Sequence, residues 1–348
     1  MDTKMALTYP FEPPAPRQTC EVSPGVHWVR LAMPFKLDHI NVWSIDTDDG
    51  WVLVDTGLNT PETVADWQAL MSRGPLSRPL CGVYATHMHP DHIGLAGWLT
   101  RRAGAPLFMS RLEYLSCRVT ISDTYREAPP EGIEFHRQAG WTDAEVEIYR
   151  SRFGNFGKYI KTLPDSYRRL QDGDEIKLGA HFWRVITTAG HSPEHVCLYC
   201  PAAKLLIAGD QVLPNISSNV SVFPGEPEAN PLLEWYASIH KLLQQVPDDV
   251  LVLPSHNAPF RGLHERLIRL REDQNRSMER LRQSLVQQAL HTVEAFPALF
   301  NRDRLNMDAQ QLSLATGEAT ACLNYLIAQG FASRAIDKNG VFFYSCIK

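Results

Sequence analysis

The sequence has little of what marks the more specialised classes of protein. Its seven cysteines are odd in number and scattered over 348 residues, unlike the paired framework of a disulfide-stapled secreted domain. The formal net charge is -5, from 34 Lys and Arg against 39 Asp and Glu, which gives no bulk attraction to nucleic acid or to an anionic membrane. No apolar run approaches the length of a membrane span or a signal-peptide core. We therefore expect a cytoplasmic protein with reduced thiols and no membrane partner.

Local nucleophile and thiol motifs are also sparse. The GxSxG pattern of many serine hydrolases does not occur. Cys197 and Cys200 form a CxxC pair, but residues three apart in a strand lie on opposite faces. That geometry favours two small apolar residues over a redox pair or a metal site.

The chain does contain enough apolar sequence, 44% of its residues, for more than one hydrophobic core. Residues 1–25 are rich in proline and lack periodicity, so we expect an N-terminal arm. Residues 26–258 begin with strand-like runs and continue with alternating helices and strands, which predicts an α+β catalytic domain. Thr60 and Pro61 are expected to begin one of these helices, and residues 91–102 are expected to form a helical stretch. Residues 259–348 combine a long amphipathic helix, a second helix and a final hairpin, typical of a small winged-helix-like module.

Residues 111–169 interrupt the catalytic domain with helix signals, such as a capping box of Thr142 and Glu145, and no strand alternation. Their last twenty residues contain one acid, Asp165, against a group of basic residues: Arg150, Arg152, Lys158, Lys161, Arg168 and Arg169. Two interpretations fit this insertion. It is either a helical lid with a cationic rim beside an active site or a solvated helical insertion with an apolar inner face.

The most informative segment is ATHMHPDHIG, residues 85–94. Side chains two apart on an extended chain share a face, so His87 and His89 can meet at one metal ion. Asp91 and His92 open the next helix and point back into the same space, where they offer a carboxylate and an imidazole to a second ion. Such ligands suit Zn²⁺, Fe or Mn²⁺.

Further ligands must come from elsewhere, because one local motif cannot fill two coordination spheres. His191 follows a strand-like run and a glycine, Asp210 ends the run LLIAGD, and His256 follows VLVLPS. All three are therefore expected along one edge of a sheet sandwich. Any one of these histidines alone would more often be an ordinary core or surface residue. Together with the first motif, they indicate a metal centre.

These segments resemble, in order, the five motifs of the metallo-β-lactamase-fold hydrolase superfamily: Asp55 in VLVDTG, the run THMHPDH, His191, Asp210 and His256. The resemblance implies a four-layer αββα sandwich that carries the helical insertion and the C-terminal module. It also implies two divalent metal ions, with zinc first and iron or manganese as alternatives. The implied ligand set is divided between the ions, with one shared carboxylate: His87, His89 and His191 for the first, Asp91, His92 and His256 for the second, and Asp210 bridging both.

The same resemblance gives supporting roles to residues near the ligands. Asp55 is implied to be a buried carboxylate that supports the ligand loop, with a strand-end turn acid as the alternative. Thr86, directly before the first ligand, is assigned to the same outer layer. His195, four residues after His191, is expected to line the pocket or to pack, and Tyr159 is a second candidate for substrate contact.

The implied reaction is hydrolysis, in which a hydroxide held between two metal ions attacks a carbonyl carbon. Asp91 and Asp210 are the expected catalytic carboxylates, and Asp91 is placed to accept a hydrogen bond from the nucleophile or to carry its proton. The complete ligand set resembles that of the glyoxalase II type of thioesterases. This favours a thioester or ester of a small anionic substrate.

The alternative is a phosphodiesterase or ribonuclease with the same metals. The C-terminal module, with the run PFRGL, resembles that of a β-lactamase-like subgroup that includes a mitochondrial endoribonuclease. Residues 316–330, the predicted second helix of that module, contain neither Lys nor Arg, which argues against nucleic acid as a partner. A lactonase ranks lower because Gln211, Val212 and Leu213 follow Asp210 where such enzymes place a tyrosine, and a true β-lactamase ranks lower because of Asp210 itself. We expect a small-molecule substrate, and the lid and the C-terminal module are candidate homodimer surfaces.

Overall fold

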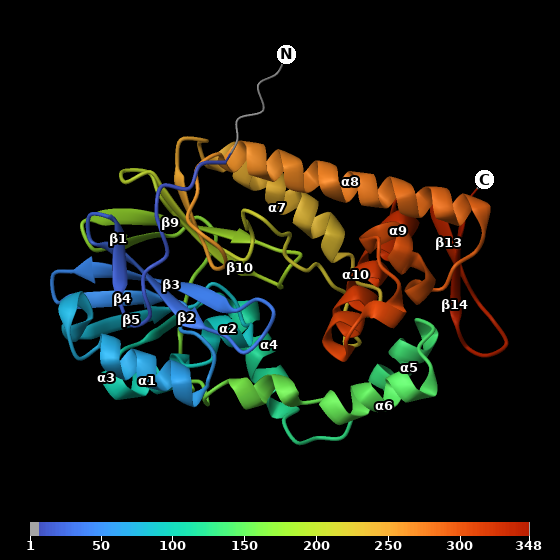
Figure 1. Ribbon diagram of the computed structural model, residues 1–348, viewed down its shortest axis with the longest axis horizontal. Coiled ribbons are helices and arrows are strands. Elements are labelled where there is room, and N and C mark those ends of the chain that lie inside the picture. Colours follow the sequence, from blue (N-terminus) through green and yellow to red (C-terminus); the bar gives the residue numbers. More distant parts are fainter. Residues whose placement is uncertain (1–6, 348) are drawn as a thin grey trace, which may run out of the picture.

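The computed structural model describes residues 7–347. Residues 1–6 of the predicted N-terminal arm and Lys348 of the predicted C-terminal module lie outside the described residues. Two β-sheets pack face to face and helices cover their outer faces, which confirms the expected α+β sandwich of four layers (Figure 1). None of the described helices is both long and apolar enough to cross a membrane.

The larger sheet is antiparallel in its first half and parallel in its second half. Its strands follow the order of the chain: β1 (Thr19–Ser23), β2 (Val26–Ala32), β3 (His39–Thr47), β4 (Gly50–Val54), β5 (Leu80–Tyr84), β6 (Leu107–Met109) and β7 (Arg168–Arg169). Strand β1 lies within the segment expected to be an arm, because Thr19 to Ser23 pair with β2 along the sheet edge.

The smaller sheet uses the strands after the insertion, and β11 and β12 run parallel within it. Its spatial order is β12 (Leu251–Pro254), β11 (Leu205–Gly209), β10 (His195–Cys200), β9 (His181–Thr188) and β8 (Glu175–Leu178). Cys197 and Cys200 of β10 are free, buried thiols, as expected for small apolar residues.

Large apolar side chains hold the two sheets together. Trp28 of β2 and Trp43 of β3 stack with ring centroids 6.0 Å apart, and Trp183 of β9 is also buried in this layer. Each such ring removes roughly 150–250 Å² from water, which makes this layer the main hydrophobic contact between the sheets. The packing aligns the ends of β4, β5, β11 and β12 at one edge of the sandwich.

Helices α1 (Pro61–Leu70) and α3 (Ala96–Ala103) cover the larger sheet, whereas α7 (Pro231–Gln245) and the first half of α8 (Leu263–Gln287) cover the smaller one (Figure 1). Thr60 caps α1 as expected, with its side chain accepting a hydrogen bond from the backbone N–H of Thr63. The helical stretch predicted over residues 91–102 is present, with one break. The structure divides it into α2 (Pro90–Ile93) and α3, because the Leu95 N–H donates to Thr56 Oγ1 and leaves the helical ladder.

The insertion extends from the catalytic sandwich to the C-terminal helices (Figure 1). Its elements are α4 (Arg111–Ser122), α5 (Pro130–Gln138), α6 (Asp143–Arg152) and the short 3-10 helix η2 (Asn155–Tyr159). The expected capping box of Thr142 and Glu145 begins α6. Trp141 Nε1 donates to Thr316 Oγ1 at 2.9 Å, so the α5 and α6 part is docked on the C-terminal domain.

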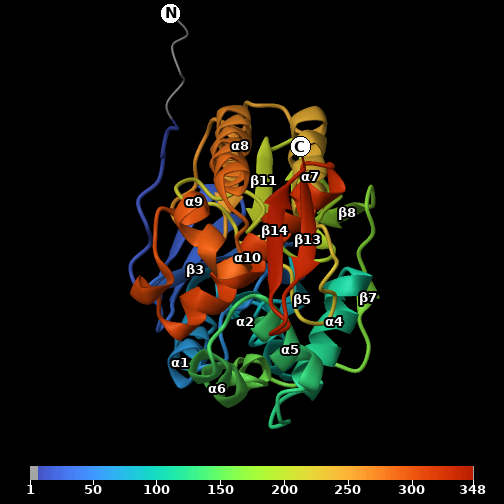
Figure 2. The same ribbon diagram turned by 90° about the vertical axis from the view of Figure 1, so that its right-hand side faces the viewer.

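The C-terminal domain is built from helices followed by a hairpin, as predicted. After α8 come η3 (Thr292–Ala295), α9 (Phe296–Phe300), η4 (Arg304–Asn306), α10 (Ala309–Ala328) and the hairpin strands β13 (Ala332–Ile336) and β14 (Phe342–Cys346). Figure 2 shows α10 beside the hairpin, with α8 running above them. The domain shares one hydrophobic core with α7 and the outer face of the smaller sheet. This shared core fixes it against the catalytic sandwich.

Candidate metal centre

The seven residues expected to bind metal come together at the aligned strand ends. The turn after β5 carries His87 and His89, and α2 carries Asp91 and His92. The other three residues follow β9, β11 and β12: His191, Asp210 and His256. Their side chains form two adjacent groups, one of His87, His89, His191 and Asp210 and one of Asp91, His92 and His256.

The first group is a convergence of imidazole nitrogens. His87 Nε2 lies 2.8 Å from His89 Nδ1 and 3.2 Å from His191 Nε2. His191 Nε2 is also 3.4 Å from Asp210 Oδ2. Burial and the neighbouring imidazoles lower the pKa of His87 well below its ordinary value, and burial and His191 lower the pKa of His89 to about 3. These rings are therefore neutral, as metal ligands must be.

The second group mixes imidazoles with carboxylates. Asp91 Oδ2 lies 3.6 Å from His92 Nε2 and 3.4 Å from His256 Nε2. Burial opposes protonation of His92 and His256, but the charges of Asp91 and Asp210 outweigh it. They raise the pKa of His92 well above its usual range and that of His256 to about 10. Asp91 and the adjacent Asp210 thus favour a positive charge at the position of this group.

Asp210 contacts both groups with different oxygens. Its Oδ2 faces His191, whereas its Oδ1 lies 3.5 Å from His92 Nε2 and 3.4 Å from His256 Nε2. Burial raises the pKa of the Asp210 carboxyl, but His256, His92 and the hydrogen bond from His191 outweigh it and hold this pKa well below its ordinary value. An ionised carboxylate with one oxygen toward each group has the geometry of a bridging ligand.

The donor set fits divalent metal ions. His92 Nε2 and Asp210 Oδ1 are buried and have no hydrogen-bond partner among the described residues. An unpaired buried nitrogen and oxygen are costly, by about 1–3 kcal/mol each, unless a further group binds them. Imidazole nitrogens and carboxylate oxygens directed at common points supply the ligands that zinc, iron and manganese take.

Asp55 and Thr86 support the ligands from below. Asp55 is buried at the end of β4 and has a positive φ of 63°, an uncommon conformation that Asp tolerates better than most residues. Its Oδ2 accepts a hydrogen bond from Thr86 Oγ1 and is paired with His92 Nδ1, both at 2.8 Å. This carboxylate therefore fixes the orientation of His92.

His195 is fully buried beneath the centre. Its Nε2 accepts the backbone N–H of Asp210 at 3.2 Å, and Gly209, which has no Cβ, leaves room for the imidazole ring. Of the two roles expected for His195, the structure therefore supports packing and not a contact with substrate. Its position orients Asp210.

Three residues support the ligands in a way that the sequence does not predict. Glu113 of α4 is fully buried, and its carboxylate accepts hydrogen bonds from Met88 N, Ser192 Oγ and Glu194 N at 2.6 to 2.9 Å. The Asn219 carbonyl is bonded to His191 Nδ1 at 2.7 Å, and the His39 carbonyl to His256 Nδ1 at 2.8 Å. The only available signal was Glu113 itself, an acid on the same helix face as Tyr114 and Cys117.

Tyr159 lies at the surface beside the metal centre. It ends η2, its carbonyl accepts the N–H of Asn59, and its ring meets Phe35 edge to face at 6.0 Å. The next residue but one, Lys161, donates its N–H to the carbonyl of Gly94, directly after α2. The exposed side chains of Lys158, Tyr159 and Lys161 therefore border the helix that carries Asp91 and His92.

Comparison with known proteins follows the same division of the chain. The family model described as "Metallo-beta-lactamase superfamily" matches residues 36–256. A second model, described as "Metallo-beta-lactamase-like, C-terminal domain", matches residues 278–347. The chain belongs to the metallo-β-lactamase superfamily. Membership of this family implies divalent metal ions, which the His and Asp groups can hold.

Relatives cover nearly the whole chain. A crystal structure of a beta-lactamase domain protein from Burkholderia ambifaria is 37% identical, covers 98% of both chains and superimposes with a TM-score of 0.89. "Probable metallo-hydrolase YqjP" from Bacillus subtilis is 24% identical and covers 90% of this chain and 96% of its own. Human "Acyl-coenzyme A thioesterase MBLAC2" is 27% identical over 71% of this chain and 82% of its own. This member of the metallo-β-lactamase superfamily is therefore a hydrolase.

Proposed function

We propose that the protein is a dinuclear metal-dependent hydrolase that cleaves a thioester or ester of a small anionic substrate. The observation that carries the proposal is the placement of Asp210, with one carboxylate oxygen toward each of the two histidine groups. Zinc is the first choice of metal for this donor set, with iron and manganese as alternatives. Ions bound here would supply a water of lowered pKa and a Lewis acid for the substrate oxygen.

Asp91 is the residue we assign to proton transfer. Its side chain is 20% exposed, whereas that of Asp210 is 11% exposed and enclosed by imidazoles. The Asp91 carboxylate can therefore accept a hydrogen bond from a water that enters from solvent, take its proton, and deliver that proton to the departing thiolate or alkoxide. Asp55, Glu113 and the Asn219 carbonyl keep the surrounding side chains in place without moving.

The surface next to Asp91 favours an anionic acyl carrier. Lys158 and Lys161 are exposed beside η2 and lie close to α2, with the Tyr159 ring between them in sequence. Three other cations of the predicted rim are already engaged: Arg150 pairs with Glu147 at 3.0 Å, Arg169 pairs with Glu194 at 3.8 Å, and Arg168 lies over the Phe108 ring at 5.4 Å. Lys158 Nζ lies over the Tyr125 ring at 5.8 Å, so Lys161 is the lysine left for a phosphate-bearing thioester. The similarity to a protein named as an acyl-coenzyme A thioesterase supports this class of substrate.

A substrate panel with the metal-loaded protein tests the proposal. We expect release of free thiol from acyl-coenzyme A substrates of increasing chain length, weaker turnover of p-nitrophenyl esters, and no cleavage of bis(p-nitrophenyl) phosphate or RNA. Cleavage of the phosphodiesters with no cleavage of any ester or thioester would contradict the proposal and support the phosphodiesterase alternative.

The role of the lysines is tested separately with Lys161→Ala. We expect KM for an acyl-coenzyme A to rise about two- to fivefold, the scale of one exposed ion pair. The KM for the matching acyl-N-acetylcysteamine, which lacks the phosphates, should not change. Lys177→Ala, on the exposed face of β8, is the matched control. An equal rise for both thioesters would contradict phosphate recognition by Lys161.

A further inference from the structure

A long loop between β11 and α7, residues 211–230, reaches back to the metal centre through one carbonyl group. The Asn219 carbonyl accepts a hydrogen bond from His191 Nδ1 at 2.7 Å. That bond leaves His191 Nε2 free to face His87 and Asp210. A carbonyl bonded to one ring nitrogen fixes both the tautomer and the rotation of a histidine ligand.

The side chain of Asn219 is itself held from two sides. Its Nδ2 donates to Glu318 Oε2 at 2.9 Å, and its Oδ1 accepts a hydrogen bond from the Ser221 hydroxyl. Glu318 belongs to α10, in the C-terminal domain. A connected series of hydrogen bonds thus runs from α10 through Asn219 to His191.

Helix α10 also holds the backbone of this loop. Val222 N donates to the Gly317 carbonyl at 3.0 Å, inside the helix. A Cβ at Gly317 would lie 2.8 Å from both Ser221 Cβ and the Val222 carbonyl oxygen. Glycine is a poor helix former, and its presence in the middle of α10 is explained by this close approach of the loop.

We propose that Glu318 is a positioning residue for His191, acting through Asn219, so that the C-terminal domain forms part of the metal centre. This inference rests on the proposed role of His191 as a metal ligand. Through the Asn219 side chain, Glu318 sets the direction of the carbonyl that meets the His191 ring. Substitution of Glu318 is expected to lower the affinity for the ion held by His87, His89 and His191 and to leave the affinity for the other ion unchanged.

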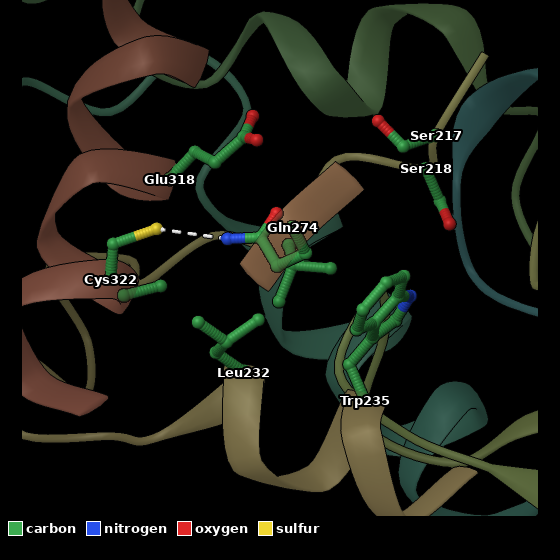
Figure 3. Close-up of a pocket in the computed structure, with 9 residues that line it drawn as sticks. Ser217, Ser218, Leu232, Trp235, Gln274, Glu318 and Cys322 are labelled. Atoms are coloured by element: carbon green, nitrogen blue, oxygen red, sulfur yellow. Dashed lines mark hydrogen bonds between the residues drawn. The ribbon is translucent and has the colours of Figure 1, made fainter. Parts of the chain in front are cut away.

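The surroundings of Glu318 favour this role over a structural one. Figure 3 shows Glu318 and Cys322 on α10 facing a cavity that Leu232 and Trp235 border from α7. Burial raises the pKa of Glu318 to about 7. When the pKa of a carboxyl is higher in the folded than in the unfolded protein, the folded protein loses stability as the pH rises above the ordinary pKa of that group. At pH 8, above the raised pKa of Glu318, this loss of stability is nearly complete. A leucine here would relieve this loss, so the acid is not explained by folding stability.

The test compares Glu318→Leu and Glu318→Gln with Gln274→Leu, a change in the lining of the same cavity that does not touch Asn219. Metal-free protein is titrated with Zn²⁺ in competition with a chromophoric chelator. His191→Ala and His256→Ala identify which binding step belongs to which ion. We call the binding step that His191→Ala removes the His191 step, and the step that His256→Ala removes the His256 step. We expect Glu318→Leu to weaken zinc binding in the His191 step about tenfold, the lower end of the range for outer hydrogen-bond partners of metal ligands.

The controls separate positioning from folding and from the proposed function. Glu318→Gln should restore affinity to within about threefold, because its amide oxygen can accept from Asn219. Gln274→Leu should bind as the unchanged protein does, and Glu318→Leu should melt at the same or a higher temperature at pH 8. The inference is overturned if Glu318→Leu retains the His191 step, or if Gln274→Leu loses as much. Failure of the unchanged protein to bind two ions would instead overturn the proposed function.

Discussion

The two halves of the metal centre differ in what orients them. The half of Asp91, His92 and His256 depends on the catalytic sandwich alone, because Asp55 at the end of β4 holds His92 and the carbonyl of His39 in β3 holds His256. The half of His87, His89 and His191 has support from the sandwich through Thr86, which contacts His87 Nδ1 at 3.1 Å, but it also depends on later additions to the sandwich. Glu113 of the insertion binds the Met88 and Ser192 segments, and Asn219 is tied to α10.

This difference shows that the insertion and the C-terminal domain are more than covers for the sandwich. Both additions place a carboxylate at the same half of the centre, from opposite directions in the sequence. If two ions bind as proposed, we expect changes in these regions to affect the ion at His87, His89 and His191 more than the other. The following variants are ordered by the size of the expected effect.

Asp210→Ala should affect both halves of the centre, because it deletes the carboxylate that faces both. We expect loss of bound metal from both groups and a fall in kcat/KM of roughly 10³-fold, since metal activation is worth several kcal/mol. Metal content by mass spectrometry and thioester kinetics measure the two effects. Retention of metal content and turnover would show that Asp210 does not bridge the groups.

Asp55→Asn should affect the sandwich-supported half most, because Asp55 is paired directly with His92 and reaches His87 only through Thr86. Asn tolerates the positive φ of residue 55 but places an amide where His92 Nδ1 requires an acceptor. We expect Zn²⁺ affinity in the His256 step to fall about 10- to 100-fold. The matched control is Asp46→Asn, in the pair of Asp46 with His27 at 3.2 Å, which lies in the sheet and should leave both steps unchanged.

Glu113→Gln should have the complementary effect on the other half. The carboxylate accepts three hydrogen bonds, and an amide must turn its NH₂ group toward at least one of those donors. We expect about tenfold weaker binding in the His191 step. One unpaired buried group should also lower the free energy of unfolding by about 1–3 kcal/mol.

The control for Glu113→Gln is Glu134→Gln, an exposed position on α5 in the same insertion. It should change neither the metal affinity nor the stability. If Glu113→Gln weakened both zinc steps equally, the division of support between the halves would be wrong.

Trp141→Phe should produce the smallest effect and should not involve the metal. The change removes the hydrogen bond to Thr316 that joins the insertion to α10. We expect a loss of about 1–2 kcal/mol in unfolding free energy, from the hydrogen bond and the smaller ring. Urea denaturation measures this loss, and zinc titration should give two unaltered steps. A weakened zinc step would mean that the docking of the insertion also orients the centre.

Much of the fold could be predicted because its signals are local. Thr60 before Pro61 and the pair of Thr142 and Glu145 marked helix starts that the structure confirms. The seven predicted ligands also come together, since each follows an apolar strand and strand ends share a sheet edge. The helical stretch predicted over residues 91–102 is present, but its break after Ile93 could not be predicted, because the Thr56 hydroxyl that interrupts it comes from another part of the chain.

Asp55 and Thr86 were predictable as supports from their place beside the ligands, but the other supports of the centre could not be predicted for a related reason. Asn219 and His39 meet the histidine ligands through backbone carbonyls, which every residue has, so no sequence pattern marks these two contacts. Glu318 lies 127 positions after His191 and reaches it only through a folded loop. His195 has the sequence position of a pocket residue, yet the structure buries it beneath Asp210.

The most direct test of the account is a crystal structure of the zinc-loaded protein with anomalous scattering at the zinc edge. We predict two peaks, each about 2.0–2.2 Å from its ligand atoms. One should lie among His87, His89 and His191 and the other among Asp91, His92 and His256, with Asp210 in contact with both. A single peak, or a second peak away from Asp210, would contradict the two-ion centre.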